Sequence, residues 1–263
     1  MNSEGALSNV QFLTVRREEG IAFVTLDRPP VNAVNQQMYT EIRATFEALN
    51  QHGDLRAVVF TGAGQKAFCA GNDLNEFLTM MPDNAAERMR IVREAFWSIY
   101  DCVVPVVGAI NGPALGTGLA LAASCDILVA SERATFGLPE INVGVMGGAS
   151  HLSRLVPEMV MRRLFYSGQA VAASEMLRWG AVAQVVPADQ LLESARNIAM
   201  EIARKSPVAV RFAKRSLNTI EFMDLKKGYE FEQRLSGEFS ASEDSKEAVR
   251  AYFERRAPQF RGR

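Results

Sequence analysis

Apolar and polar positions near the start of the chain follow two different periods. Residues 10–19 and 21–29 are rich in β-branched and aromatic side chains and are separated by Gly20, which predicts a β-hairpin. In residues 36–50 the apolar positions recur at helical spacing instead. The chain is therefore expected to open with a hairpin that leads into an amphipathic helix.

Strands and helices then alternate through the middle of the chain. Short apolar runs at residues 56–62, 104–110 and 125–131 read as buried strands, and residues 84–102 read as an amphipathic helix. Strands that alternate with helices need crossover connections, which give a mainly parallel sheet between helical layers. The pattern predicts the α/β class.

After about residue 150 the strand signal nearly stops, and residues 181–187 form its one clear exception. Amphipathic helical patterns lie at residues 188–206, 207–220 and 244–256. No low-complexity linker or repeat separates the two halves. We therefore predict an α/β core over residues 1–195 and a C-terminal helical subdomain over residues 196–263, a kind of region that often carries self-association surfaces.

Composition narrows the class of partner. The 263 residues are 48% hydrophobic and 22% charged, and the net charge is only -1. This balance favours neither nucleic acid nor an acidic membrane surface as a partner. No run approaches the roughly 20 apolar residues of a membrane span, and the first residues lack a secretory pattern, so a cytoplasmic protein is expected. The three cysteines match no zinc or disulfide spacing, which predicts buried free thiols.

Two loops rich in small residues are candidates for chemistry. Residues 68–74 ("FCAGNDL") and 112–118 ("GPALGTG") each follow a predicted strand, and the second precedes a predicted helix. Small side chains leave main-chain N–H groups accessible, and two such groups can form an oxyanion hole. The alternative is that both loops are tight turns with no chemical role. Common phosphate-loop, dinucleotide, zinc-protease and serine-hydrolase motifs are absent.

Glu140 lies in an almost wholly apolar stretch, "ATFGLPEINVGVMGG". Burial disfavours an ionised carboxylate, so the pKa of Glu140 is expected to be raised, as suits an acid/base catalyst. A glutamate that caps a helix or pairs with a cation is an equal alternative.

Five segments in order resemble the crotonase superfamily, also called the enoyl-CoA hydratase/isomerase family. They are "VTLDRPPVNAVN", "RAVVFTGAGQKAFCAGNDL", "PVVGAINGPALGTGLALAASCDILVAS", "ATFGLPEINVGVMGG" and "EDSKEAVRAYFERRAPQF". The resemblance implies a spiral of repeated ββα turns and a homotrimer or hexamer built through the C-terminal helices. It also implies an acyl-CoA thioester substrate, of which coenzyme A is a part, with no separate cofactor and no metal.

The resemblance assigns roles to individual residues. It implies that the main-chain N–H groups of Ala70 and Thr117 hold a thioester enolate and that Glu140 moves the proton. Together with the chemistry of the side chains, it gives a set of candidate substrate-binding residues: Val31, Asn32, Ala33, Cys69, Gly71, Asn72, Asp73, Gly116, His151, Lys214 and Arg255. For several of these a simpler role is also open: packing for Cys69, helix capping for Asp73, and solvated surface charge for Lys214 and Arg255. His151 could contact substrate and titrate near pH 7, or be satisfied by a helix end.

Ala120 departs from the pattern of the hydratases, which place a first glutamate there and a second at the position of Glu140. With one carboxyl group the resemblance favours double-bond isomerisation of an enoyl-CoA. Hydration, or the hydration and cleavage of hydroxycinnamoyl-CoA, remains an alternative, as does a non-catalytic CoA-ester binder. The acyl group itself is not predicted.

Overall fold

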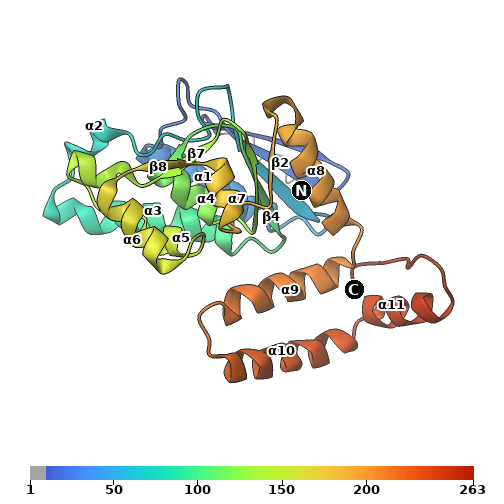
Figure 1. Ribbon diagram of the computed structural model, residues 1–263. Helices are drawn as coiled ribbons and strands as arrows, with labels where there is room; N and C mark the ends of the chain where they lie inside the picture. Colours follow the sequence, from blue (N-terminus) through green and yellow to red (C-terminus); the bar gives the residue numbers. More distant parts are fainter. Residues whose placement is uncertain (1–9) are drawn as a thin grey trace.

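The chain forms two sheets, a large one of six strands and a smaller one of three short strands (Figure 1). The computed structural model describes residues 10–263. The large sheet contains, in spatial order, β1 (Leu13–Glu18), β2 (Ile21–Leu26), β3 (Ala57–Gly62), β4 (Val106–Ile110), β6 (Ile127–Ser131) and β9 (Gln184–Val186). The smaller sheet contains β5 (Ala114–Leu115), β7 (Thr135–Gly137) and β8 (Ala170–Ala172).

The strand pairing follows the burial of each segment. β1 and β2 form the predicted antiparallel hairpin, in which Glu19 and Gly20 turn the chain with positive φ angles of 50° and 77°. From β2 onward neighbouring strands of the large sheet are parallel. β3 and β4 are buried along their whole length, which explains why both read as continuous apolar runs.

Helices cover both faces of the large sheet. One face packs against α1 (Gln36–Leu49), α3 (Pro82–Tyr100) and α4 (Thr117–Ala123), which share the main hydrophobic core with it. The other face packs against α8 (Leu191–Ala203), whose Ala195 and Ala199 are fully buried. Both halves of α8 thus belong to the core, so the predicted boundary at residue 195 is wrong. It moves to the loop between α8 and α9.

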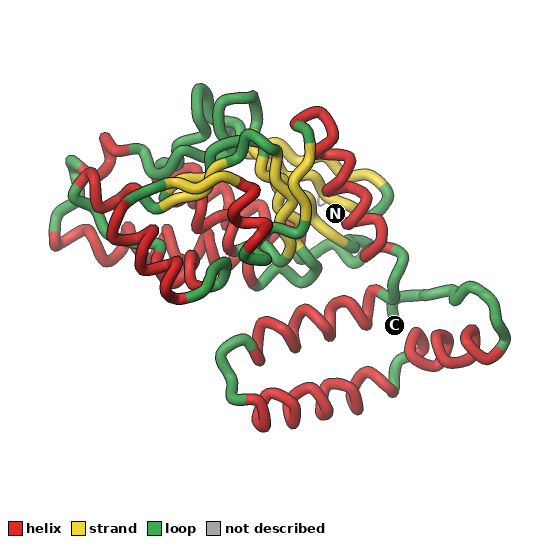
Figure 2. The backbone as a smooth tube through the Cα atoms, viewed as in Figure 1, coloured by secondary structure: helices red, strands yellow, loops and turns green. Residues whose placement is uncertain are grey.

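The last three helices stand apart from the α/β core (Figures 1 and 2). They are α9 (Pro207–Ile220), α10 (Leu225–Ser240) and α11 (Glu243–Phe253). The remaining short helices are α2 (Leu74–Phe77), η2 (Pro139–Val143), α5 (Ala149–Ser153), α6 (Glu158–Ser167), α7 (Ala173–Arg178) and η3 (Ala188–Gln190). α9 begins at a proline, where the missing N–H leaves no helical hydrogen bond unmade.

The α/β class, the ββα repetition and a helical C-terminal region are as predicted, although α10 was not among the individually predicted helices. Cys69, Cys102 and Cys125 are buried free thiols, as expected from their spacing. Within residues 10–263 none of the helices combines the length and the apolar character that a membrane span requires.

Candidate active site

A cavity of about 490 Å³ opens where the loops after β3 and β5 meet α3 and the η2 segment. Its wall is mainly apolar, with polar groups at a few points. The lining residues that carry the argument below are Gln36, Asn72, Asp73, Glu76, Arg88, Phe96, Gly116, Thr117, Ala120, Glu140 and His151. Both small-residue loops and Glu140 therefore meet at one site, as the sequence predicts.

Glu140 is a half-buried carboxyl group in the first turn of η2. Its Oε2 atom is buried and has no hydrogen-bond partner among the residues that the structure describes. Burial raises the pKa of Glu140, because the charged form loses hydration that a backbone hydrogen bond at Glu140 only partly offsets. The group is thus chemically available, and neither helix capping nor ion pairing occupies it.

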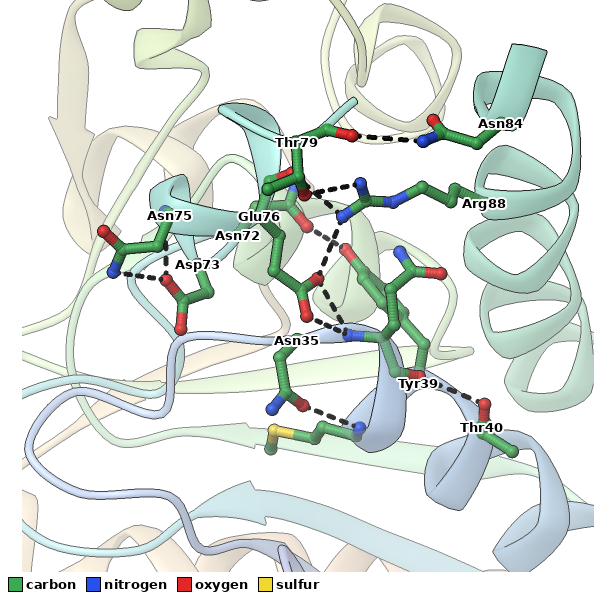
Figure 3. A network of polar contacts seen from close by, with 12 residues as sticks. Asn35, Tyr39, Thr40, Asn72, Asp73, Asn75, Glu76, Thr79, Asn84 and Arg88 are labelled. Carbon is green, nitrogen blue, oxygen red and sulfur yellow. Dashed lines mark hydrogen bonds and ion pairs between the residues drawn. The ribbon is translucent and has the colours of Figure 1, made fainter. Parts of the chain in front are cut away.

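Two other carboxyl groups reach the cavity wall, and both have partners. Asp73 accepts a 2.7 Å hydrogen bond from Arg28 and caps α2 through the N–H of Asn75. Glu76 accepts the main-chain N–H of Gln36 at 3.2 and 3.0 Å, on its Oε1 and Oε2 atoms (Figure 3). The helix-capping role of Asp73 is confirmed. Of the three carboxyl groups, Glu140 alone is free to act on a ligand.

The structure corrects one of the two predicted oxyanion donors. The N–H of Ala70 donates to the carbonyl of Val31 at 3.0 Å, and Ala70 does not line the cavity. Two residues further on, Asn72 does line it, as does Thr117. In the described part of the chain no acceptor takes the N–H of either residue. The first donor is therefore reassigned from Ala70 to Asn72.

Gly116 allows the glycine loop to pass beside the carboxyl group. Its φ of 55° and ψ of -117° suit glycine, and a Cβ atom there would lie 2.6 Å from Oε1 of Glu140. The same loop starts α4, so Thr117 occupies the first helical position with its N–H unpaired. Gly116 thus brings Glu140 and the Thr117 donor close together.

Tyr39 connects the two loops, and sequence analysis did not identify it. Its hydroxyl lies 2.5 Å from Oδ1 of Asn72 and 2.7 Å from Oγ1 of Thr117. Figure 3 shows Tyr39 of α1 pointing toward Asn72, beside Glu76 and Arg88. Because Tyr39 lies on the apolar face of α1, its pattern in the sequence is that of an ordinary core residue.

His151 lies in α5 at the cavity wall, with its ring 4.8 Å from that of Phe96. Burial, and to a smaller extent the nearby positive charge of Arg154, together lower its pKa to about 4. The imidazole is neutral at pH 7, so the predicted titration near pH 7 is wrong. Contact with substrate stays a prediction.

Two predicted binding residues serve the fold instead. Asn32 is 2% exposed, and its Nδ2 atom donates to the carbonyls of Ala63, Ala67 and Phe68 at 3.0–3.2 Å. Cys69 is fully buried, and burial raises the pKa of its thiol to about 12. Neither side chain reaches the cavity, so a side-chain contact with substrate is not supported, and contact through the main chain stays a prediction.

Lys214 also has a different role from the predicted one. Its ammonium group lies 2.6 and 2.7 Å from the two carboxylate oxygens of Asp126, and the side chain is 4% exposed. This part-buried ion pair engages the ammonium group of Lys214, which favours a structural role over the predicted contact with a phosphate. Val31, Ala33 and Gly71 lie outside the cavity wall, and Arg255 is exposed after α11. Their contacts with coenzyme A stay predictions.

The family model described as enoyl-CoA hydratase/isomerase matches residues 16–263. The chain belongs to the enoyl-CoA hydratase/isomerase family. A probable enoyl-CoA hydratase of Mycobacterium bovis is 37% identical, over 94% of this chain and 97% of that protein. An enoyl-CoA hydratase subunit of Geobacillus kaustophilus has a TM-score of 0.91 at 34% identity, over 97% of this chain and all of that one.

A further relative has a different activity in its name. The (7aS)-7a-methyl-1,5-dioxo-2,3,5,6,7,7a-hexahydro-1H-indene-carboxyl-CoA hydrolase of Mycobacterium tuberculosis is 40% identical, over 85% of this chain and 90% of that protein. Membership of the enoyl-CoA hydratase/isomerase family thus shows that the protein is an acyl-CoA enzyme, and it leaves the type of reaction open.

Ala120 lies in the cavity wall one turn into α4, at the position where the hydratases carry their first glutamate. Its methyl group can neither move a proton nor hold a water molecule. Among the described carboxyl groups that line the cavity, Glu140 is thus the one without a partner, and it shares the cavity with the N–H groups of Asn72 and Thr117.

Proposed function

We propose that the protein is an acyl-CoA enzyme that forms a thioester enolate and shifts the double bond of an enoyl-CoA. The observation that carries this proposal is the free carboxyl group of Glu140 beside the unpaired N–H groups of Asn72 and Thr117. The N–H pair would bind the thioester oxygen as negative charge develops on it.

The proton transfer needs only one carboxyl group. Glu140 takes a proton from the carbon of a 3-enoyl-CoA next to the thioester, and the electron pair of that C–H bond moves to the thioester oxygen. The enolate then collapses, the double bond moves into conjugation with the thioester, and the γ carbon takes the proton back from Glu140. The products and reactants have the same composition, so no water or cofactor is consumed.

Hydration is less well supported by this site. Adding water across a double bond requires a group that activates water and a group that protonates the α carbon. Ala120 removes one of the two carboxyl groups that hydratases use, while Asp73 and Glu76 are held by Arg28 and by the N–H of Gln36. Glu140 would have to perform both steps.

Hydrolysis is the second candidate, and the relative that is 40% identical supports it, because its name describes a dioxo ring carboxyl-CoA hydrolase. The bond that would use this site is a carbon–carbon bond to the α carbon. When such a bond next to the α carbon breaks, its electron pair also forms a thioester enolate. The same N–H pair would hold that enolate, and Glu140 would activate the water. Mass spectrometry separates the two reactions: isomerisation leaves the mass of the acyl-CoA unchanged, whereas hydrolysis adds one water molecule.

Replacement of Glu140 tests the proposal. Glu140→Gln keeps the shape of the side chain but removes the base, so kcat should fall at least about 100-fold while the acyl-CoA still binds. Turnover near that of the wild type on the same substrate would exclude Glu140 as the acid/base. A wild-type protein that binds acyl-CoA but converts none of a panel of 3-enoyl, 2-enoyl and aryl-enoyl esters would instead be a non-catalytic binder.

Self-association is proposed through the C-terminal helices, as a trimer or hexamer. Large apolar side chains are exposed there in the isolated chain, among them Phe222 (82%), Leu225 (87%), Tyr252 (80%) and Phe253 (77%). Apolar surface of this extent is typical of an interface. The molar mass in solution, measured by light scattering, should be three or six times that of the chain.

A further inference from the structure

The two loops that hold the N–H donors are joined at two levels. At the first level the N–H of Leu115 donates to the carbonyl of Cys69 at 3.0 Å, and Cys69 pairs with Ala114 as an isolated β-bridge. Beyond that bridge each loop turns toward the cavity and reaches its donor, Asn72 or Thr117. The Tyr39 hydroxyl makes the second connection, at the donor residues themselves.

The direction of the hydrogen bonds follows from the donors available. Oδ1 of Asn72 can only accept, so Tyr39 gives it the single hydroxyl proton. Thr117 must then donate its own hydroxyl proton to Tyr39. The chain of bonds runs from Thr117 through Tyr39 to Asn72, and the Thr117 hydroxyl has no proton left to offer to a ligand.

Tyr39 is held firmly enough to act as a fixed point. It is 1% exposed, and its ring meets that of Phe96 edge-on at 6.0 Å. The start of α1, one turn earlier, is capped by Asn35, whose Oδ1 accepts the N–H of Met38 at 2.8 Å. The first N–H of that helix, at Gln36, is taken by Glu76. Movement of the Tyr39 hydroxyl therefore requires movement of α1.

We propose that Tyr39 is a positioning residue that sets the distance between the two oxyanion donors. This inference rests on the proposed enolate chemistry. A donor stabilises a developing oxyanion only within a narrow range of distances, about 2.7–3.1 Å between the two heavy atoms. Loss of the two hydrogen bonds of the Tyr39 hydroxyl lets the Asn72 and Thr117 loops move independently. The contacts of the two N–H donors with the transition state should then weaken more than binding of the ester does.

The experiment uses butyryl-CoA labelled with carbon-13 at the thioester carbonyl, bound to the full-length protein. Tyr39→Phe should lower the saturating rate of α-proton exchange in deuterium oxide about 10- to 100-fold. The concentration of ester that gives half the maximal rate should change less than about 2-fold. The infrared carbonyl band, lowered by binding to the wild type, should move back toward its position in free solution.

Tyr100→Phe is the matched control. The Tyr100 hydroxyl also makes two hydrogen bonds, at 3.1 Å to the carbonyl of Asn218 and at 2.6 Å to Glu221, but it joins α3 to α9 and its contacts lie outside the donor loops. Its removal should lower stability without changing the exchange rate or the carbonyl band. A carbonyl band in Tyr39→Phe equal to that of the wild type would overturn the inference.

Thr117→Val keeps the test decisive if Tyr39→Phe does not fold. Valine removes the hydroxyl and leaves the main-chain N–H in place, so it should shift the band in the same direction. If both variants fold, their effects on the exchange rate should be far from additive, because each breaks the same chain of bonds. Additive effects, or a Thr117→Val band equal to that of the wild type, would contradict the positioning role. If the wild type binds the ester but neither shifts the band nor exchanges protons, the proposed function fails instead.

Discussion

At the scale of single residues, Glu140 combines availability with an unfavourable environment. Its carboxyl group is partly desolvated and its Oε2 atom lacks a donor, so ionisation, which catalysis needs, is less favourable than in an exposed glutamate. Functional residues commonly lower stability in this way. The unpaired Glu140 is therefore expected to affect both the pH dependence of kcat and the stability of the fold.

Glu140 should give the rate a dependence on pH. The base acts when ionised, and its pKa is raised, so kcat should increase as the pH rises through a value above the ordinary range of a glutamate. A rate profile of the wild type with a saturating enoyl-CoA measures this value. A profile that is already flat at pH values where free glutamates titrate would show that Glu140 is not desolvated in the complex.

The same shift predicts a stability gain in Glu140→Gln. A raised folded-state pKa means that the stabilising contribution is present below the unfolded pKa and is lost as the pH rises through the folded one. At pH 7 the wild type therefore carries the cost of an ionised, unpaired carboxylate, which glutamine lacks. The Tm of the variant should exceed that of the wild type at pH 7, by a margin that shrinks toward pH 4.

His151 should make the protein less stable in mild acid. Its folded pKa of about 4 lies below the ordinary value of 6.5, so the unfolded chain binds a proton first and the free energy of unfolding decreases as the pH falls through this window. Between pH 7 and pH 5 the loss should be roughly 1–2 kcal/mol by urea denaturation. In His151→Asn this part of the loss should vanish, and an unchanged pH dependence would contradict the assigned burial.

The raised pKa of Glu140 and its place in the cavity were predictable, because a carboxyl group stands out in an apolar stretch. The error at Ala70 has a different cause. Main-chain donors carry no side-chain signal, and the position of a free N–H within "FCAGNDL" depends on which carbonyl each residue meets. Val31 takes the Ala70 N–H in the fold, and nothing in the sequence states that pairing.

At the scale of elements, the glycine loop before α4 determines how closely Glu140 approaches the donors. Gly116→Ala should lower kcat at least about 100-fold, because its Cβ would meet Oε1 of Glu140 at 2.6 Å. Gly64→Ala is the control: Gly64 also has a positive φ, of 75°, but no atom lies within 4 Å of its added Cβ. It should cost about 1 kcal/mol of stability and leave kcat unchanged.

Helices and strands with a clear period were predictable within a few residues, and α9 matches its predicted range, residues 207–220, at both ends. The short strands β5, β7 and β8 were not predicted. β5 has two residues and β7 and β8 have three each, too few to show an alternation. They form because the ββα turns place them side by side, which is tertiary information.

At the scale of the whole molecule, Lys214 fixes the C-terminal helices to the core. The ammonium group of Lys214 on α9 pairs with Asp126, which also accepts the N–H of Val106 at 2.7 Å. Lys214→Met leaves Asp126 without its cation and should cost about 2 kcal/mol of stability. The KM for an acyl-CoA should stay the same. A large rise in KM that depends on salt would restore Lys214 as a phosphate contact.

The architecture as a whole joins one unpaired carboxyl group to two main-chain donors, and the central claim is that this set makes a thioester enolate. Incorporation of deuterium at the α carbon of an acyl-CoA in deuterium oxide measures that step directly. The wild type should incorporate label at a rate that Glu140→Gln lowers at least about 100-fold with binding intact. Equal incorporation by the two proteins, or none by the wild type with any acyl-CoA that it binds, would contradict the claim.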